Sequence, residues 1–320
     1  MVPWRFCIAP MMDRTDRHFR AMFRRISRHA LLYTPMIAAQ AVVSRRADAE
    51  LDHDLAEHPL AIQLGGSDPP VLAAATRIAA DRGFVEASLN CGCPSPAAAQ
   101  ATWGAALMDH PQRVADAVFA MAAAAPIDIT VKHRLGIVGR DDAERLLAFV
   151  DIVTAAGASR VIVHARAAIL GGASTAANRK IPPLRPEMVA ALVRARPELV
   201  VVDNGGIADL DHVRERSHGV GLRGGVMVGR AAYDDPYRWI DVDRVVYGDD
   251  TPRPTRREIA EHAFARAADH ARPHAITRHA LGLWHGVPRA RRARDLVATI
   301  AHGLAVHDAA PALAVLDAAQ

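Results

Sequence analysis

Cysteines and long apolar runs are both scarce in this sequence. The 320 residues include three cysteines, Cys7, Cys91 and Cys93, and this small odd number excludes a disulfide framework and fits a reducing compartment. No apolar run reaches the roughly 18–20 residues of a membrane-spanning helix. The N-terminal segment lacks the apolar core and cleavage site of a secretory signal. We therefore expect a cytoplasmic protein that does not bind membranes.

The composition allows a large core and places the positive charge unevenly. Hydrophobic residues make up 51% and charged residues 23%, which excludes a disordered or fibrous chain. The net charge is +4, yet between Arg253 and Arg294 ten arginines face only three acidic residues. The arginines of residues 253–272 are typical of a solvated helix face. Arg278 and the denser run 289–294 instead indicate contacts to the phosphates of a polyanion.

Short β-branched runs alternate with alanine-rich segments of helical periodicity, such as residues 70–82, 112–124 and 141–156. This alternation predicts parallel strands joined by crossover helices. The number of strands favours an α/β fold of the TIM (β/α)8 barrel type over a doubly wound sheet. The expected strands are residues 6–9, 31–34, 60–64, 85–90, 127–132, 160–164, 199–204 and 225–229.

The pattern changes after residue 247. Residues 248–254 are rich in glycine, proline and aspartate, as in a linker. Residues 255–319 show helical periodicity and no strand signal. We expect a barrel catalytic domain over residues 1–247, followed by a linker and a small all-helical domain over residues 248–320.

Glycine and polar residues cluster just after the expected strands, and in a barrel these clusters meet at the rim where active sites are built. Asn204, Gly205 and Gly206 follow the seventh strand, and Gly229 and Arg230 follow the eighth. Glycines let backbone N–H groups approach an anion, so both segments together predict a phosphate site. The alternative is that these glycines only form tight turns.

Other rim positions carry groups suited to chemistry. Lys132 ends a strand and needs a counter-charge such as a phosphate or an anionic reduced flavin, unless its amine reaches solvent. His164 and Arg166 lie two residues apart, which places both side chains on one face. Cys91 and Cys93 are too few for a zinc site, so we expect no metal. Cys93, between a glycine and a proline, is the candidate exposed thiol.

Taken in order, these motifs resemble the tRNA-dihydrouridine synthases, in particular the A-type subfamily. The resemblance covers nearly the whole chain, and its specificity comes from the ordered set. The segments that carry it are residues 8–16, 32–36, 63–69, 89–95, 104–108, 131–137, 162–166, 178–184, 204–206, 229–230 and 276–283.

The resemblance implies an FMN-binding barrel whose helical domain grips tRNA, with NADPH as the reductant and no protein partner. The residues that would contact FMN are Ala9, Pro10, Met11, Gln63, Lys132, His164, Asn204, Gly205, Gly206, Gly229 and Arg230. The residues that would contact tRNA are Asn90, Arg179, Arg278, Arg291 and Arg292.

The implied reaction is reduction of uridines in the tRNA D-loop, at positions 20 and 20a, to 5,6-dihydrouridine. The uridine would leave its stack to reach the flavin. Hydride would pass from flavin N5 to uracil C6, and Cys93 would be the general acid that protonates C5. A thiol suits this role because it is mostly protonated at neutral pH and can still release its proton.

Three departures from the family pattern stand out. Residues 96–102 form an alanine-rich loop where charged or polar residues are usual. Arg289 stands where glycine is common, and Ala293 stands where an aromatic residue is common. The first departure bears on the loop beside Cys93 and the other two on tRNA contacts.

Two alternative functions remain open at this point. One is an FMN barrel of the dihydroorotate dehydrogenase type that acts on a free pyrimidine or another small enone. The basic helical segment argues against it, since such an enzyme has no need of one. The other is an RNA-binding protein with a vestigial redox site, against which stand the intact Cys93, Lys132 and His164.

Overall fold

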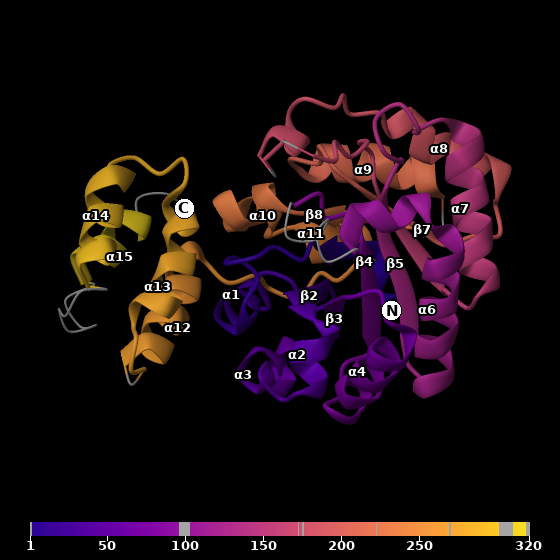
Figure 1. Ribbon diagram of the computed structural model, residues 1–320. Coiled ribbons are helices and arrows are strands. Elements are labelled where there is room, and N and C mark those ends of the chain that lie inside the picture. Colours follow the sequence, from indigo (N-terminus) through magenta and orange to yellow (C-terminus); the bar gives the residue numbers. More distant parts are fainter. Residues whose placement is uncertain are drawn as a thin grey trace.

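The computed structural model describes residues 2–95, 103–171, 173–174, 176–221, 223–268, 270–300 and 310–317. Eight parallel strands pair in chain order, and the last pairs with the first, which closes a barrel (Figure 1). The TIM barrel expectation is confirmed, and the doubly wound alternative is wrong. The strands are β1 Phe6–Ile8, β2 Leu31–Ala38, β3 Leu60–Gly65, β4 Glu86–Cys91, β5 Asp128–Arg134, β6 Arg160–His164, β7 Val201–Asn204 and β8 Gly225–Val228.

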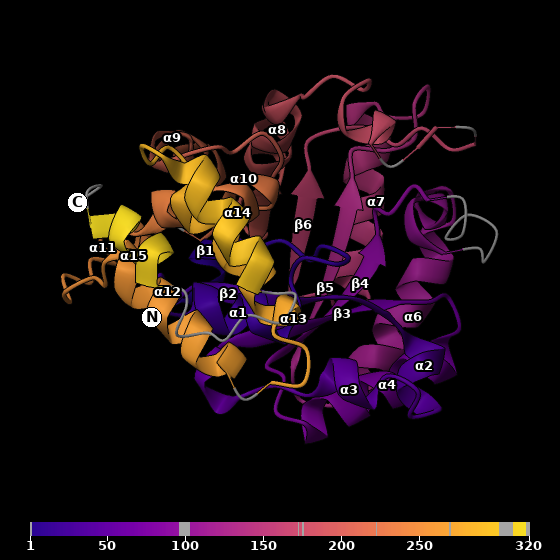
Figure 2. The ribbon, with the colours of Figure 1, turned by 90° about the vertical axis from the view of Figure 1, so that its left-hand side faces the viewer.

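Helices surround the barrel, and a further group packs at its side (Figures 1 and 2). Around the barrel lie α1 Arg17–Phe23, α2 Ala39–Val43, α3 Asp48–Leu51, α4 Pro69–Asp81, α6 Pro111–Ala124, α7 Ala143–Ala155, α8 Pro186–Ala195, α9 Leu210–Val220, α10 Arg230–Asp234 and α11 Val242–Tyr247. The C-terminal helices are α12 Arg256–Ala268, α13 His274–Ala280, α14 Ala290–Ile300 and α15 Ala310–Asp317. None of the helices in the described ranges is long and apolar enough to cross a membrane.

The observed strand ends differ from the expected ones mainly at the rim. β3 continues to Gly65 and β5 to Arg134, because the neighbouring strands offer pairing partners there, for example Arg134 opposite His164. β2 runs four residues beyond the expected end. Its register shifts between Tyr33 and Met36, around Pro35, which has no N–H to donate. Rim residues such as Gly65 and Arg134, which were expected in the loops after the strands, therefore belong to the strands themselves.

Two apolar layers build the barrel. Side chains that point inward form a compact inner core, and those that point outward pack under the helices. The inner core consists of Cys7, Ala9, Leu31, Tyr33, Ala61, Ile162, Val202 and Met227. Alanines on the inner faces of the helices, such as Ala75 and Ala117, allow close packing against the strands. The many alanines of the sequence thus allow the helices to pack closely against the outer face of the barrel.

A buried ion pair closes the amino-terminal end of the barrel. Glu86 accepts hydrogen bonds from the hydroxyls of Tyr33 and Thr130 at 2.5 and 2.6 Å. Its other oxygen accepts from Arg160, whose guanidinium lies 4.0 Å from the ring centre of Trp4. All four polar side chains of this network are buried, so the charge of Glu86 depends on Arg160, which also pairs with Asp128 at 2.7 Å.

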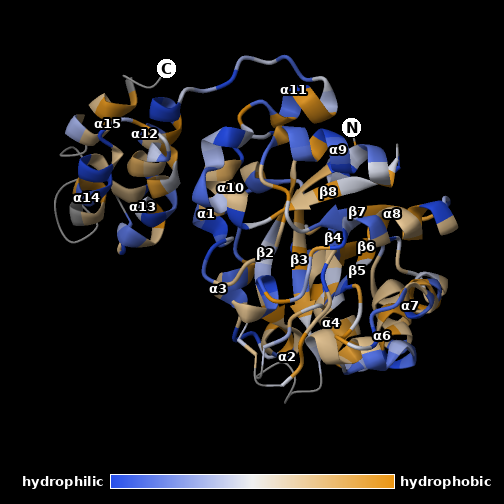
Figure 3. Ribbon diagram, turned by 90° about the horizontal axis from the view of Figure 1, so that it is seen from above, coloured by the Kyte–Doolittle hydropathy of each residue, from blue (hydrophilic) through white to orange (hydrophobic). Residues whose placement is uncertain are grey.

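The C-terminal helices α12–α15 lie at one side of the barrel (Figures 1 and 3). There α12 and α13 contact α1, and the His279 ring of α13 packs against the Tyr233 ring of α10. Their core includes Phe264, Leu283, Trp284 and Leu316, all buried. Arg289 adopts a left-handed φ of 63°, which glycine reaches at lower cost. Ala293 is buried in the same core. Residues 301–309 and 318–320 of the expected helical segment lie outside the described residues.

We expect Glu86→Ala to lower the free energy of unfolding by about 3–5 kcal/mol, because Arg160 is left buried without its main counter-charge. Urea denaturation followed by far-UV circular dichroism measures the change. The matched control is Asp234→Ala, which removes an exposed ion pair with Arg14 and should cost at most about 1 kcal/mol. Equal midpoints for the two variants would contradict a stabilising role for the buried network.

Candidate active site

Hydrogen bonds tie together the carboxyl ends of β5, β7 and β8. The Lys132 amine donates to Oδ1 of Asn204 at 3.0 Å, and the Asn204 amide donates to the Met227 carbonyl at 2.7 Å. Asn204 is buried, so its amide is fixed in one orientation. Lys132 thereby points into the barrel mouth and keeps further N–H donors for another acceptor.

Positive charge accumulates around Lys132. Burial and the nearby Arg134 lower the pKa of Lys132 to about 7, although Cys93 acts in the opposite direction. Burial first, and then Arg134, Lys132 and Arg166, hold the pKa of His164 well below its usual value. His164 is therefore neutral at pH 7. Burial is the larger cause of both shifts, and the neighbouring cations add to it. Several cations close to one another at the mouth favour binding of an anion there.

Asn90 organises the segment that carries Cys93. Its amide donates to Oε1 of Gln63 at 2.8 Å, and its carbonyl oxygen accepts from the backbone N–H groups of Gly92 and Cys93 at 3.1 and 2.9 Å. Cys93 is partly exposed, whereas Cys7 and Cys91 are buried. Burial also raises the pKa of Cys91 well above that of an ordinary thiol. Cys93 is thus the accessible thiol, and its backbone position is fixed by Asn90.

Gln63 presents an unused donor at the same place. Its side chain is buried, its oxygen is taken by Asn90, and its Nε2 has no hydrogen-bond partner among the described residues. A buried amide N–H without a partner costs about 1–3 kcal/mol. The unpaired Nε2 of Gln63 therefore indicates a position for a hydrogen-bond acceptor of a ligand.

The glycines after β7 leave space that a side chain would fill. A Cβ at Gly205 would lie 2.7 Å from the His164 ring, and one at Gly206 would lie 2.3 Å from Leu184. Both residues also have positive φ values, 110° and 77°. At Gly229 a Cβ would meet Ala9 and Met11 only at ordinary contact distance, 3.6 Å. Gly205 and Gly206 are therefore required for the close approach of this loop to His164 and Leu184.

Three arginines border the mouth near these glycines. Arg230 begins α10, and its charge contributes to the lowered pKa of Arg166 and of Arg179. Arg179 and Arg230 are exposed, and neither makes an ion pair with a residue in the described ranges. Arg166 donates to the carbonyl of Pro182. Two guanidiniums are therefore available to an anionic ligand at the rim.

The structure brings most of the predicted site residues to this mouth. Ala9, Pro10 and Met11 leave β1 beside β8, with the Ala9 N–H donating to the Val228 carbonyl at 2.7 Å. Asn90 was expected to contact the substrate nucleotide, and here its side chain is engaged with Gln63 and the Cys93 segment. The alanine-rich loop 96–102 lies outside the described residues.

The predicted tRNA contacts of the C-terminal helices lie elsewhere. Arg291 and Arg292 are exposed on α14. Arg278 on α13 donates to Asp16 at 2.6 Å, and His279 bonds the same carboxylate at 3.0 Å. Asp16 also caps the amino end of α1. Asp16, which the sequence reasoning did not select, therefore joins the barrel to the helical segment beside the mouth.

Arg134 is a second residue that sequence reasoning missed. Its side chain is buried and donates to the carbonyls of Gly92, Ala167 and Asn178, at 2.9, 2.9 and 3.2 Å. It thus links the Cys93 segment to the loop after β6. The signal was present in the run Lys-His-Arg at a strand end, but its contacts depend on segments distant in the sequence.

We expect the stability of the ligand-free chain to gain a contribution from Lys132 as the pH rises from about 7 toward 10.5. Over this window the unfolded chain keeps the Lys132 proton and the folded chain has released it, so stability increases by up to about 1.4 kcal/mol per pH unit. Urea midpoints between pH 6 and 9.5 should show that Lys132→Met loses this slope. Lys180→Met, at an exposed position, should keep it, and parallel profiles for both variants would contradict the burial argument.

Comparison with known proteins identifies the family of the chain. The family model described as dihydrouridine synthase matches residues 7–318. The tRNA-dihydrouridine(20/20a) synthase of Pseudomonas putida is 45% identical over 319 residues, which cover 98% of this chain and 93% of that protein. The proteins of the same name from Pseudomonas aeruginosa and Synechocystis are 45% and 46% identical, over 98% and 89% of this chain and 94% and 85% of theirs. The chain therefore belongs to the dihydrouridine synthase family and is an enzyme of that class.

Proposed function

We propose that the protein reduces uridines at positions 20 and 20a of the tRNA D-loop to 5,6-dihydrouridine, with FMN as cofactor and NADPH as reductant. The observation that carries the proposal is the convergence of a partly exposed thiol, an orphaned amide donor and a cluster of cations at one barrel mouth. The relatives named above act on these two tRNA positions, as their names state.

The residues at the mouth fit FMN. The free Nε2 of Gln63 is a donor for a ring acceptor, and the Lys132 amine can stabilise negative charge on the ring. The phosphate would be held by the segment of Asn204, Gly205 and Gly206 together with Gly229 and Arg230, with His164 beside it. Ala9, Pro10 and Met11 would form the backbone surface under the ring. When bound and reduced by NADPH, FMN supplies the hydride that adds to C6 of uracil.

The protein side of the chemistry rests on Cys93. Its thiol gives the proton that C5 of uracil gains, and Asn90 holds its backbone through two hydrogen bonds. Arg134 fixes the same segment to the loop after β6. Holding the thiol against the face of the base opposite the flavin supplies the orientation that the reaction requires. Asn90 and Arg134 act as positioning residues.

For tRNA we propose a surface that continues from the mouth onto the helical domain of residues 248–320. Arg179 borders the mouth, and Arg291 and Arg292 are exposed on α14. Arg278 would contribute its charge while remaining paired with Asp16. A base reaches the barrel only after it leaves the D-loop stack, so contacts to the surrounding phosphates stabilise the extruded state.

We expect Cys93→Ala to lower the rate of dihydrouridine formation about 10²–10⁴-fold while FMN remains bound, because only the proton donor is lost. The assay follows NADPH oxidation with unmodified cognate tRNA and mass spectrometry of the product. The control Cys91→Ala removes a buried thiol two residues away and should retain activity. Turnover of free uracil or orotate without any response to tRNA would instead favour a small-molecule enzyme. A chain that cannot bind FMN would favour an RNA-binding role.

We expect the double variant Arg291→Ala/Arg292→Ala to raise KM for tRNA and to reduce the salt dependence of binding. Each lost phosphate contact should lower the slope of log K against log salt by about 0.7–0.9. Filter binding at several salt concentrations measures this slope. Arg45→Ala/Arg46→Ala removes the same charge from the segment between α2 and α3 and should leave it unchanged.

A further inference from the structure

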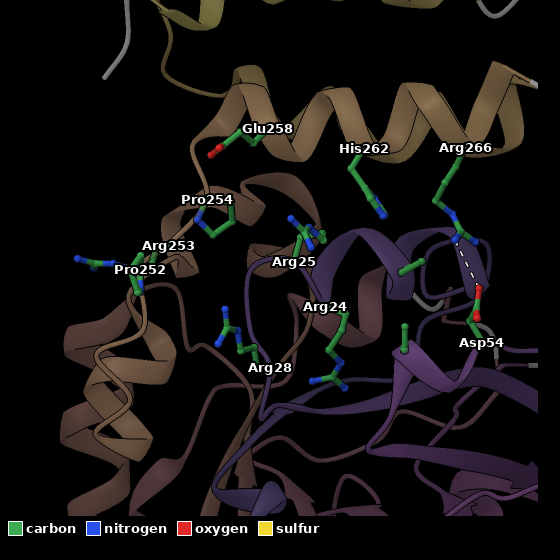
Figure 4. Close-up of a pocket in the computed structure, with 12 residues that line it drawn as sticks. Arg24, Arg25, Arg28, Asp54, Pro252, Arg253, Pro254, Glu258, His262 and Arg266 are labelled. Carbon is green, nitrogen blue, oxygen red and sulfur yellow. Dashed lines mark ion pairs between the residues drawn. The ribbon is translucent and has the colours of Figure 1, made fainter.

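A cavity of about 480 Å³ lies between the barrel and the C-terminal helices, away from the candidate active site. Its walls come from α1 and the segment after it, from the linker, and from α12 (Figure 4). In Figure 4, Arg25 and Arg28 lie on the barrel side, Arg253 lies on the linker, and His262 and Arg266 point down from α12. The cavity therefore joins the two parts of the chain.

The lining carries more positive than negative charge. Five arginines line it, against the two carboxylates of Asp54 and Glu258. Arg266 pairs with Asp54 at 3.5 Å, and Arg253 pairs with Asp241. The side chains of Arg25 and Arg28 make no hydrogen bond or ion pair with any residue that the structure describes, although Arg25 is near enough to lower the pKa of Glu258. Two guanidiniums are thus free for a ligand.

Arg24, at the base of the cavity, carries a third charge without an ion pair among the described residues. Its guanidinium donates to the carbonyls of Ser27, Ala30, Glu57 and Pro59, while its Nε has no partner. Burial lowers its pKa to about 10. Carbonyl oxygens accept the hydrogen bonds of the Arg24 guanidinium but do not neutralise its charge. The cavity therefore keeps a positive electrostatic potential.

The positive charge in the cavity acts on the imidazole of His262. Burial and the charges of Arg25 and Arg266 lower its pKa, and its Nδ1 is buried without a hydrogen-bond partner in the described part of the chain. The other charged groups that line the cavity with it are Arg24, Arg28, Arg253, Asp54 and Glu258. An anion placed among these arginines would reverse the effect and favour the protonated imidazole.

The position of the cavity separates it from the entrance used by the uridine. α1 begins near the rim, because residues 9–16 leave the carboxyl end of β1. Arg24 follows the end of α1 and binds the carbonyls of Ala30 and Pro59, which directly precede β2 and β3. The cavity therefore lies toward the amino ends of the strands, and the candidate active site lies at their carboxyl ends.

We propose that this cavity binds a small oligophosphate, such as pyrophosphate or the polyphosphate chain of a nucleotide, and that the ligand links the barrel to the helical domain. Guanidinium groups match phosphate oxygens in charge and in bidentate geometry. The free guanidiniums spread over a volume typical of small-ligand sites, which offers room for more than one phosphate group. The inference does not depend on the activity proposed above.

Isothermal titration of the FMN-saturated full-length protein with sodium pyrophosphate tests the proposal. The double variant Arg25→Gln/Arg28→Gln should bind pyrophosphate at least tenfold more weakly, since two charge-assisted contacts are lost. Arg291→Gln/Arg292→Gln removes the same charge from α14 and should bind it as the wild type does. Equal affinity of the wild type and the Arg25/Arg28 variant would overturn the proposal.

A second readout locates the ligand. Pyrophosphate should raise the pKa of His262, followed by NMR of the imidazole C–H signals and assigned with His262→Gln. No change in that titration would overturn the proposal even if heat is released elsewhere. Displacement of pyrophosphate by tRNA would assign the arginines to the RNA backbone and would also overturn it. Equal affinity for orthophosphate would exclude an oligophosphate as the specific ligand.

Discussion

The closed parallel hydrogen-bond ladder is the constraint from which the rest of this molecule follows. Because β1 pairs with both β2 and β8, all eight carboxyl ends are brought to one rim. Residues as far apart in the sequence as Gln63, Lys132 and Asn204 then share one mouth. Closure also leaves a barrel interior that side chains must fill. At the amino ends of the strands, the Glu86–Arg160 network fills this interior with paired charges instead of apolar atoms. The two ends of the barrel are therefore electrostatically different.

At the carboxyl end, Lys132, Arg179 and Arg230 make no ion pair with a residue in the described ranges. Burial lowers the pKa of Lys132 and of His164, and the neighbouring cations lower both pKa values further. A site of this kind is stabilised when an anionic ligand enters. In the cavity between α1 and α12, the side chains of Arg25 and Arg28 likewise make no ion pair with any residue that the structure describes. Both places therefore carry cationic side chains that no described carboxylate pairs with.

A carboxylate near the mouth joins the barrel to the helical segment. Asp16 caps α1, accepts from Arg278 and bonds His279. These interactions hold the pKa of Asp16 well below its usual value, so its charge persists at neutral pH. These bonds fix α13 relative to the mouth, and α14, which carries Arg291 and Arg292, packs against α13. Any substrate that spans both parts encounters them in a defined arrangement.

The strand order, most strand positions and the types of residue at the rim can be predicted from the amino-acid sequence. Alternating β-branched runs and alanine-rich helices are local patterns, so β6 was predicted with its observed bounds and the TIM barrel followed from the number of strands. The exposed Cys93 also followed from local sequence, since the adjacent glycine and proline restrict its backbone. The contacts of each polar group, in contrast, follow only from the folded chain. Asn90 turned out to hold Cys93, Arg134 to join two loops and Asp16 to join two parts of the chain, because their partners lie tens to hundreds of residues away and meet only when the barrel closes.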